Sequence, residues 1–271
     1  TWITPRLRQL PWRDTRDPWH VLVSEVMLQQ TGVNRVLPKW QMFVDAFATP
    51  ADCAGAPLGD VLRLWQGLGY PRRARNLQAG ARVIVEQHDG LTPSTLDELL
   101  ALPGIGPYTA RAVLAFAFES DVAVVDTNIA RVLARFHGRK LKLREAQELA
   151  DDWIPAGESW LWNQALMDLG ATVCKPQPLC DECPLLDRCS WRGTGDDPSV
   201  GSAGVSVAQA RFEGSDRQAR GRLIKQLGEC AVPIHAVAEI MDRPPATAER
   251  LVANLVDEGL VIRQHGELLL P

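Results

Sequence analysis

Apolar residues recur three and four positions apart along most of this chain, and glycine or proline separates the segments that show the pattern. Such spacing places the apolar side chains on one face of an α-helix. Only the run Ala-Val-Val at 123–125 has the composition of a short strand. The pattern predicts an all-α body with helices over residues 21–30, 37–48, 60–68, 74–88, 95–102, 110–118 and 127–136.

The composition changes after residue 190, where small and polar residues rich in glycine and serine predict a linker over residues 191–206. Three more helical segments follow at 221–229, 235–241 and 247–261, and His265-Gly266 marks an expected hairpin. This order is typical of a small winged-helix unit, here residues 207–271. Its candidate recognition helix is rich in acidic and amide groups, so we expect packing against the rest of the chain or weak contact with DNA.

With 46% apolar and 23% charged residues, the 271-residue chain can bury a sizeable core. It lacks both a membrane-spanning apolar run and the apolar stretch of a secretory signal, so we expect a soluble cytoplasmic protein. The net charge of −4 argues weakly against nucleic acid. Basic residues nevertheless exceed acidic ones in the first 50 residues, and Arg72, Arg73 and Arg75 are either part of a basic face or an ordinary solvated helix end.

The segment Leu-Pro-Gly-Ile-Gly-Pro-Tyr at 102–108 precedes an apolar helix. Gly104 and Gly106 leave backbone N–H groups bare at the start of that helix, which suits an anion such as a DNA phosphate. On the glycines alone, an ordinary tight turn between helices is the simpler interpretation.

Two carboxyl groups stand in contrasting surroundings. Asp126 lies between Val-Val and a new helix, where a helix N-cap is the simplest role. Glu25 lies among apolar neighbours in its helix, and burial of a carboxyl raises its pKa, which suits a general acid. An Asp kept ionised by capping N–H groups would suit stabilisation of a developing cation, and such a pair is a recurring acid/base arrangement.

Four of the six cysteines fall within sixteen residues, in the pattern C-x5-C-x2-C-x5-C. We expect them to bind metal, since an intracellular chain rarely uses disulfides. Structural zinc usually takes two C-x2-C pairs and only one is present, so a four-iron four-sulfur cluster fits better. The predicted ligands are Cys174, Cys180, Cys183 and Cys189. Cys53 and Cys230 stand apart and are expected to be small buried side chains.

Taken together, these stretches resemble the helix-hairpin-helix DNA glycosylases of the endonuclease III superfamily and, within it, the MutY family of adenine glycosylases. The resemblance covers residues 10 to about 190 in order. It is carried by LPWR (10–13), SEVMLQQT (24–31), LWQGLGYPRRARNL (64–77), LPGIGPYTARAV (102–113), VVDTNIARVLAR (124–135), NQALMDLGATVC (163–174) and the four cysteines.

The resemblance implies roles for individual residues. Glu25 would protonate the flipped-out purine, Asp126 would stabilise the cationic sugar and Asn128 would hold the pair in place. Tyr70 would wedge into the base stack. The residues implied to border the base, its pocket or the DNA are Arg13, Leu28, Gln29, Gln30, Thr31, Gly104 and Gly106. A monovalent cation is a further candidate at the turn between helices at 102–108, the hairpin of the helix-hairpin-helix motif.

Tyr108 stands where strand-cutting members of the superfamily place a lysine that forms a Schiff base. The resemblance therefore implies a monofunctional glycosylase in base excision repair that removes adenine opposite 8-oxoguanine or guanine. Thymine or uracil release from mismatches, or DNA binding without catalysis, are the alternatives. Thymine or uracil release stays open because Tyr108 also fits that branch and because relatives carry a Nudix-like reader of 8-oxoguanine where this chain has its winged-helix-like unit. The intact Glu25 and Asp126 speak against a non-catalytic DNA-binding protein.

The resemblance also implies two lobes with the active site between them. The expected domains are a helical bundle over 17–128, a cluster domain formed by 1–16 with 129–190, the linker and the C-terminal unit. The implied partner is mismatched or damaged double-stranded DNA, bound by a monomer that is nucleoid-associated if the source is bacterial.

Overall fold

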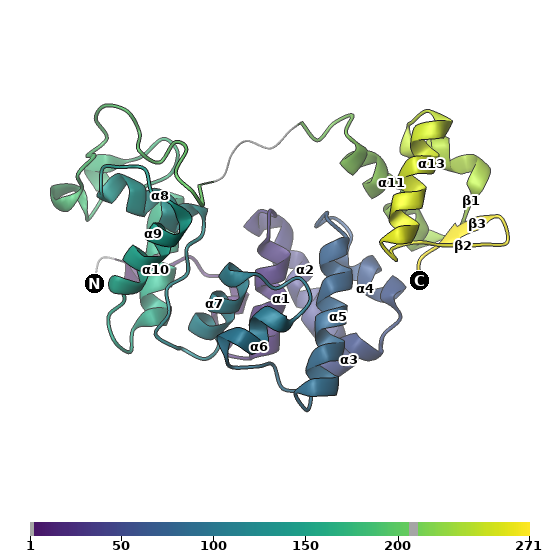
Figure 1. Cartoon of the computed structure of the whole chain (residues 1–271), viewed down its shortest axis with the longest axis horizontal. Helices are drawn as coiled ribbons and strands as arrows, with labels where there is room; N and C mark the ends of the chain where they lie inside the picture. The colour runs from purple at the N-terminus through teal and green to yellow at the C-terminus, as the bar shows by residue number, and fades with distance from the viewer. Residues whose placement is uncertain (1–2, 206–210) are drawn as a thin grey trace. The chain divides into compact units, whose positions relative to one another are not determined.

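The computed structural model describes residues 3–205 and 211–271, and these are mainly helical, as the periodicity predicts (Figure 1). The helices are α1 (Pro18–Leu28), α2 (Val33–Ala46), α3 (Pro50–Gly55), α4 (Leu58–Trp65), α5 (Arg72–Gln87), α6 (Leu96–Ala101), α7 (Pro107–Phe116), α8 (Thr127–Phe136), α9 (Leu143–Asp152), α10 (Ser159–Thr172), α11 (Asp216–Glu229), α12 (Val237–Met241) and α13 (Pro245–Asp257). Short 3-10 turns occur at Thr4–Arg6, Pro11–Arg13, Cys180–Glu182, Leu186–Arg188 and Ile234–Ala236.

The chain divides into two compact units. Unit 1 consists of Thr1–Val21, Ser94–Leu100 and Ile105–Ala208, and unit 2 of Leu22–Pro93, Ala101–Gly104 and Gln209–Pro271. Each unit therefore combines segments from distant parts of the sequence.

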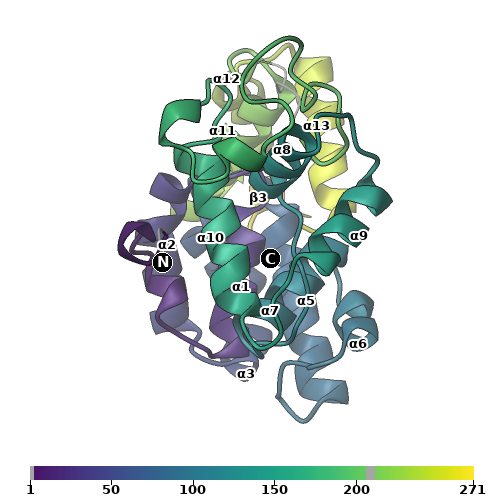
Figure 2. The same ribbon diagram turned by 90° about the vertical axis from the view of Figure 1, so that its left-hand side faces the viewer.

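The core of unit 1 is built on α8 and α10, which pack side by side with α9 against α8 (Figures 1 and 2). Ile129 and Leu133 of α8 are fully buried. Gly170 of α10 allows the close approach, because a Cβ at that position would lie 2.6 Å from the Cβ of Asn128. The two helices thus come closest at Asn128, two residues after Asp126.

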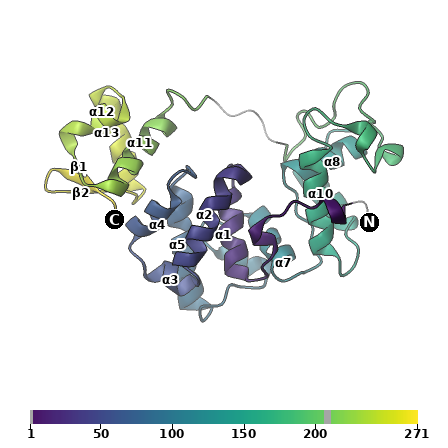
Figure 3. The same ribbon diagram turned by 180° about the vertical axis from the view of Figure 1, so that it is seen from behind.

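Unit 2 contains the helices α2, α3, α4 and α5 together with the C-terminal helices α11, α12 and α13. The C-terminal part packs α11, α12 and α13 beside a three-stranded antiparallel sheet in the order β1 (Val232–Pro233), β3 (Glu267–Leu269), β2 (Ile262–Gln264) (Figure 3). His265 and Gly266 connect β2 to β3 with φ values of 50° and 82°. Positive φ at both positions is typical of a tight hairpin turn, so the expected hairpin is confirmed.

Residues 123–125, whose composition would also suit a short strand, form none, in keeping with the all-α prediction for the body. They continue an extended segment whose backbone bonds to side chains instead, as when Val124 N donates to Asn163 Oδ1 at 3.0 Å. Cys53 is buried as expected, but Cys230 is exposed. Of the three arginines near the start of α5, only Arg72 is exposed, so they form no continuous basic face.

The segment predicted as a linker packs on unit 1 as far as Ser202, which is buried. The Ser202 hydroxyl accepts from Leu141 N at 3.1 Å and donates to Pro198 O at 2.8 Å. Residue 206 of that segment and residues 207–210 of the predicted C-terminal unit lie outside the described residues, as do residues 1–2. Among the helices that the structure describes, none has the length and apolar character to cross a membrane.

Candidate active site and cysteine cluster

Asp126 caps the N-terminus of α8 in unit 1, as its sequence position predicts. Its Oδ1 accepts from Ile129 N at 2.7 Å, and its Oδ2 accepts from Asn128 Nδ2 at 2.7 Å. Burial raises the pKa of Asp126, while the bonds from Ile129 and Asn128 act in the opposite direction. Asp126 is half-buried, and the two donors oppose the rise in its pKa without cancelling it.

Asn128 is held in turn by Arg131, which the sequence analysis did not single out. The buried Arg131 donates from Nη2 to Asn128 Oδ1 at 2.8 Å and to the Gly170 carbonyl at 2.6 Å, and its Nε donates to the Cys174 carbonyl at 2.7 Å. Because Asn128 accepts from Arg131 with its oxygen, its amide nitrogen is left to face Asp126. The spacing of Asn128 and Arg131 on one helix face was the available signal.

Glu25 lies in α1, within unit 2, and is only 4% exposed. Its helix neighbours Val21, Leu22 and Val26 are also buried. The expected apolar surroundings of this carboxyl are therefore present.

The turn after α1 contains the other residues of that motif. Leu28 and Gln29 are half-buried, Gln30 is exposed with a φ of 55°, and Thr31 is buried. The Thr31 hydroxyl donates to the Leu68 carbonyl at 3.0 Å. This bond ties the end of α1 to the loop that carries Tyr70.

Arg73 of α5 fastens the same two segments together, and sequence reasoning assigned it only to a possible basic face. Burial lowers the pKa of Arg73 to about 10, so it remains charged at neutral pH. Its guanidinium donates to six oxygens within 3.0 Å, namely the carbonyls of Val26, Met27, Gln29, Leu68 and Gly69 and the hydroxyl of Thr31. A cation at the last carbonyls of α1 also complements the helix dipole.

Tyr70 follows two glycines with positive φ, Gly67 and Gly69, and itself has a φ of 48°. A bulky side chain in this left-handed region is strained and needs support from its surroundings. Its hydroxyl accepts from Arg217 Nη1 at 2.7 Å.

The helix-hairpin-helix turn at 102–108 contains one glycine that the packing requires. Gly104 has a φ of 79°, and a Cβ there would lie 2.8 Å from the Cβ of Asn76. Gly106 instead caps α7 with an extended backbone and open space around it. Tyr108 is half-buried in the first turn of α7.

Arg13 is buried in unit 1 and forms a bidentate ion pair with Asp168 of α10, at 2.8 and 2.9 Å. Arg8 donates to the same carboxyl group. Burial alone would raise the pKa of Asp168, but the bonds from Arg13 and Arg8 lower it. The pair fixes the N-terminal segment on α10.

The four clustered cysteines are half-buried free thiols in unit 1. Arg135 of α8 donates to Cys174 Sγ at 3.4 Å, and Cys189 Sγ donates to the Arg135 carbonyl at the same distance. Among the described residues, no three acidic, His or Cys side chains converge closely enough to hold a single metal ion.

Four free thiols beside the buried Arg135 guanidinium are a donor set that would fit an iron–sulfur cluster, and the cation would offset thiolate charge.

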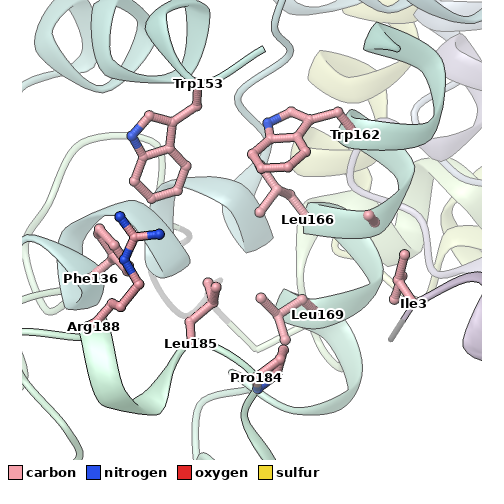
Figure 4. A pocket seen from close by; sticks show the side chains of 10 residues that line it. Ile3, Phe136, Trp153, Trp162, Leu166, Leu169, Pro184, Leu185 and Arg188 are labelled. Atoms are coloured by element: carbon pink, nitrogen blue, oxygen red, sulfur yellow. The ribbon is translucent and has the colours of Figure 1, made fainter. Parts of the chain in front are cut away.

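The cysteine loop covers an apolar cavity of about 400 Å³ (Figure 4). Pro184 and Leu185 of the loop face Leu166 and Leu169 of α10 across it. The complete lining is Ile3, Phe136, Trp153, Trp162, Ala165, Leu166, Leu169, Pro184, Leu185 and Arg188. Apart from Arg188, the side chains that line this cavity are apolar or aromatic.

Residues 23–156 match the profile of the family described as HhH-GPD superfamily base excision DNA repair protein. An adenine DNA glycosylase of Mycobacterium tuberculosis is 42% identical, over 100% of this chain and 91% of that protein. An adenine DNA glycosylase of Mycolicibacterium smegmatis is 40% identical, over 96% of this chain and 90% of its own length. The solved structure of a thermostable thymine-DNA glycosylase superposes with a TM-score of 0.65 and 31% identity, covering 71% of this chain and 91% of that one.

Proposed function

The chain belongs to the adenine DNA glycosylases of the HhH-GPD superfamily, and we propose that it removes adenine mispaired with 8-oxoguanine or guanine in base excision repair. The observation that carries the proposal is the half-buried Asp126 carboxyl group, held by hydrogen bonds from Ile129 N and Asn128 Nδ2. This is the group that hydrolysis of an N-glycosidic bond requires, since the sugar becomes cationic as the base departs.

The two carboxyl groups have separate roles in this reaction. Glu25, buried among apolar side chains, protonates the adenine ring and makes it a better leaving group. Asp126 stabilises the positive sugar, and water then attacks the anomeric carbon. Asn128 keeps the Asp126 carboxyl group in one orientation, and Arg131 keeps Asn128 in place.

Binding of DNA uses the hairpin and the Tyr70 loop. The backbone N–H groups at the start of α7, beside Gly106, bind a phosphate and position the duplex without reading its sequence. Tyr70 enters the base stack, and Leu28, Gln29, Gln30 and Thr31 border the displaced base and its partner. Extrusion of a base costs a few kcal/mol and least at a mismatch, which favours mispaired adenine.

Tyr108 determines whether the DNA strand is cut after the base has been released. A phenol cannot form a Schiff base with the sugar, so the enzyme leaves an abasic site and does not cut the backbone. The same residue is compatible with thymine release, and the match to a thymine-DNA glycosylase structure makes that the second candidate function.

We propose that Cys174, Cys180, Cys183 and Cys189 bind a four-iron four-sulfur cluster with a structural role. When bound, such a cluster crosslinks the loop between residues 174 and 189. Replacing Cys183 with Ser is expected to lower the iron content from about four per chain and to remove the visible absorbance of the cluster. Replacement of the exposed Cys230 with Ser is the matched control and should leave both unchanged.

The activity is tested by single-turnover base release from duplexes that contain A opposite 8-oxoguanine, A opposite G, T opposite G and U opposite G. Each reaction is read with and without alkali, which cleaves abasic sites. Adenine release seen only after alkali supports the proposal. Thymine or uracil release would move the protein to the second candidate, and binding without any base release would leave a non-catalytic homologue.

A further inference from the structure

Arg217 links the C-terminal part of the chain (residues 211–271) to the Tyr70 loop, the segment 66–71 between α4 and α5. Arg217, in the first turn of α11, donates from Nη1 to the Tyr70 hydroxyl at 2.7 Å, and its guanidinium carbon lies 6.0 Å from the centre of the Tyr70 ring. The proposed function assigns no role to α11.

Arg217 belongs to a row in which aromatic rings and guanidinium groups alternate, in the order Trp65, Arg73, Tyr70, Arg217 and Phe212. The guanidinium of Arg73 lies 5.3 Å from the Trp65 ring and 5.6 Å from the Tyr70 ring. On the other side, Arg217 also lies 6.0 Å from the ring of Phe212, which is 56% exposed. Tyr70 is thus contacted by two cations, one from α5 and one from α11, each at a cation–π distance.

The row matters because the backbone at Tyr70 is strained. Tyr70 has a φ of 48°, which is unfavourable for a bulky residue, and Gly67 and Gly69 before it are flexible residues with positive φ. The loop sequence by itself therefore does not favour this backbone conformation. Such a conformation persists only when surrounding groups hold it. Arg73 bonds the backbone of the loop, and Arg217 bonds the end of the Tyr70 side chain.

Within unit 2, the end of α11 and the C-terminal residue Pro271 contact α4. Gly59 N donates to the Pro271 carbonyl at 2.7 Å, and a Cβ at Gly59 would lie 2.9 Å from that oxygen. Arg63 Nε donates to the Gly228 carbonyl at the end of α11, at 3.1 Å. Arg217 therefore projects from a helix whose far end is attached to the same body as Tyr70.

We propose that Arg217 is a positioning residue for Tyr70, so that the C-terminal unit takes part in base excision by holding the side chain that enters the base stack. The proposal rests on the proposed function, in which Tyr70 distorts the duplex. Arg217 restrains the Tyr70 ring before DNA binds, which lowers the entropy cost of inserting it.

The first test replaces Arg217 with Ala and measures single-turnover adenine release on the best duplex of the panel. Loss of a charge-assisted hydrogen bond is expected to slow release roughly tenfold. The control is Arg222→Ala on the same helix, because Arg222 pairs with Asp242 at 2.9 Å instead of contacting Tyr70. Its rate should stay within about twofold of the unmodified protein.

A second readout reports on Tyr70 directly. The chain has two tyrosines, Tyr70 and Tyr108, so protein labelled with fluorotyrosine gives two ¹⁹F signals, and Tyr70→Phe assigns them. Arg217→Ala should shift the Tyr70 signal and leave the Tyr108 signal in place. In a Tyr70→Phe background, which lacks the hydroxyl, Arg217→Ala should cost less in rate than it does alone.

The outcomes separate this proposal from the proposed function. If the unmodified protein releases no base, the function itself is wrong. If it releases adenine but Arg217→Ala matches Arg222→Ala, or if the two substitutions at Tyr70 and Arg217 add fully, Arg217 does not act through Tyr70. Partial rescue by Arg217→Lys, which can still donate to the hydroxyl, would support the positioning role.

Discussion

The Asp126 turn and the Tyr70 loop carry the two proposed tasks of this enzyme, and they are stabilised in opposite ways. Asp126 has an ordinary extended backbone and takes its hydrogen bonds from residues two and three positions further along the chain. Tyr70 has a strained backbone and is supported by Arg73 and Arg217, one in the next helix and one far away in sequence.

The difference follows from what each group must do. A carboxyl group that stabilises a cation works best when it is preorganised, and a helix N-cap provides that with local bonds. An aromatic side chain that enters DNA must lie outside the core, where few local contacts are available. Long guanidinium side chains can reach it there and still bond several acceptors.

The largest effect is expected at the chemical group. Asp126→Asn should reduce base release by roughly 10³-fold or more, because a neutral amide cannot stabilise a positive sugar. Asn is as good an N-cap as Asp, so α8 and duplex binding should persist. Single-turnover release and fluorescence anisotropy with mismatched duplex measure the two properties, and unchanged release would show that the assigned mechanism is wrong.

A smaller but still large effect is expected from the support of the Tyr70 loop. Arg73→Lys leaves most of the six acceptor oxygens without a donor, which should cost about 3 kcal/mol of stability and lower Tm by roughly 6–12 °C. Thermal unfolding followed by circular dichroism measures this. Arg72→Lys, at the exposed neighbour, should leave Tm unchanged. Equal Tm values for both variants would contradict the supporting role of Arg73.

The smallest effect concerns the ionisation of Asp126. Burial raises the pKa of Asp126 and the bond from Asn128 opposes this, so Asn128→Ala should raise that pKa further. Release depends on the ionised form, so its loss as the pH falls should begin at a higher pH in the variant. At neutral pH the rate should fall about tenfold.

The pH–rate profile of single-turnover release tests this shift. Thr127→Ala is the neighbouring control, because the Thr127 hydroxyl donates to the Gly204 carbonyl at 3.1 Å. An acid limb at the same pH in both variants would mean that Asn128 does not favour the ionised carboxylate.

Local patterns in the sequence predicted much of this structure. The three- and four-residue periodicity located α1, α2 and α4 to α8 but not α3, α9 or α10, and residues 127–136 were predicted with the bounds that α8 shows. The Asp126 cap and the His265-Gly266 hairpin were also predicted, since both depend on neighbours along the chain. The buried position of Glu25 followed from the apolar residues around it in α1.

The arginines were the main omission, and tertiary structure alone decided them. Arg73, Arg131, Arg135 and Arg217 look alike in sequence, as polar residues on helices. Their acceptors are largely carbonyls, sulfur and a phenol from segments up to 147 residues away, as in the Arg217 bond to Tyr70. A carbonyl is present at every residue and leaves no mark in the sequence.

The sequence by itself thus determined most of the helices, the capped Asp126 and the spacing of the four cysteines, because each depends on side chains within a few residues of one another. Only the folded chain decided which guanidinium meets which backbone oxygen. A long side chain can reach many acceptors, and packing selects among them.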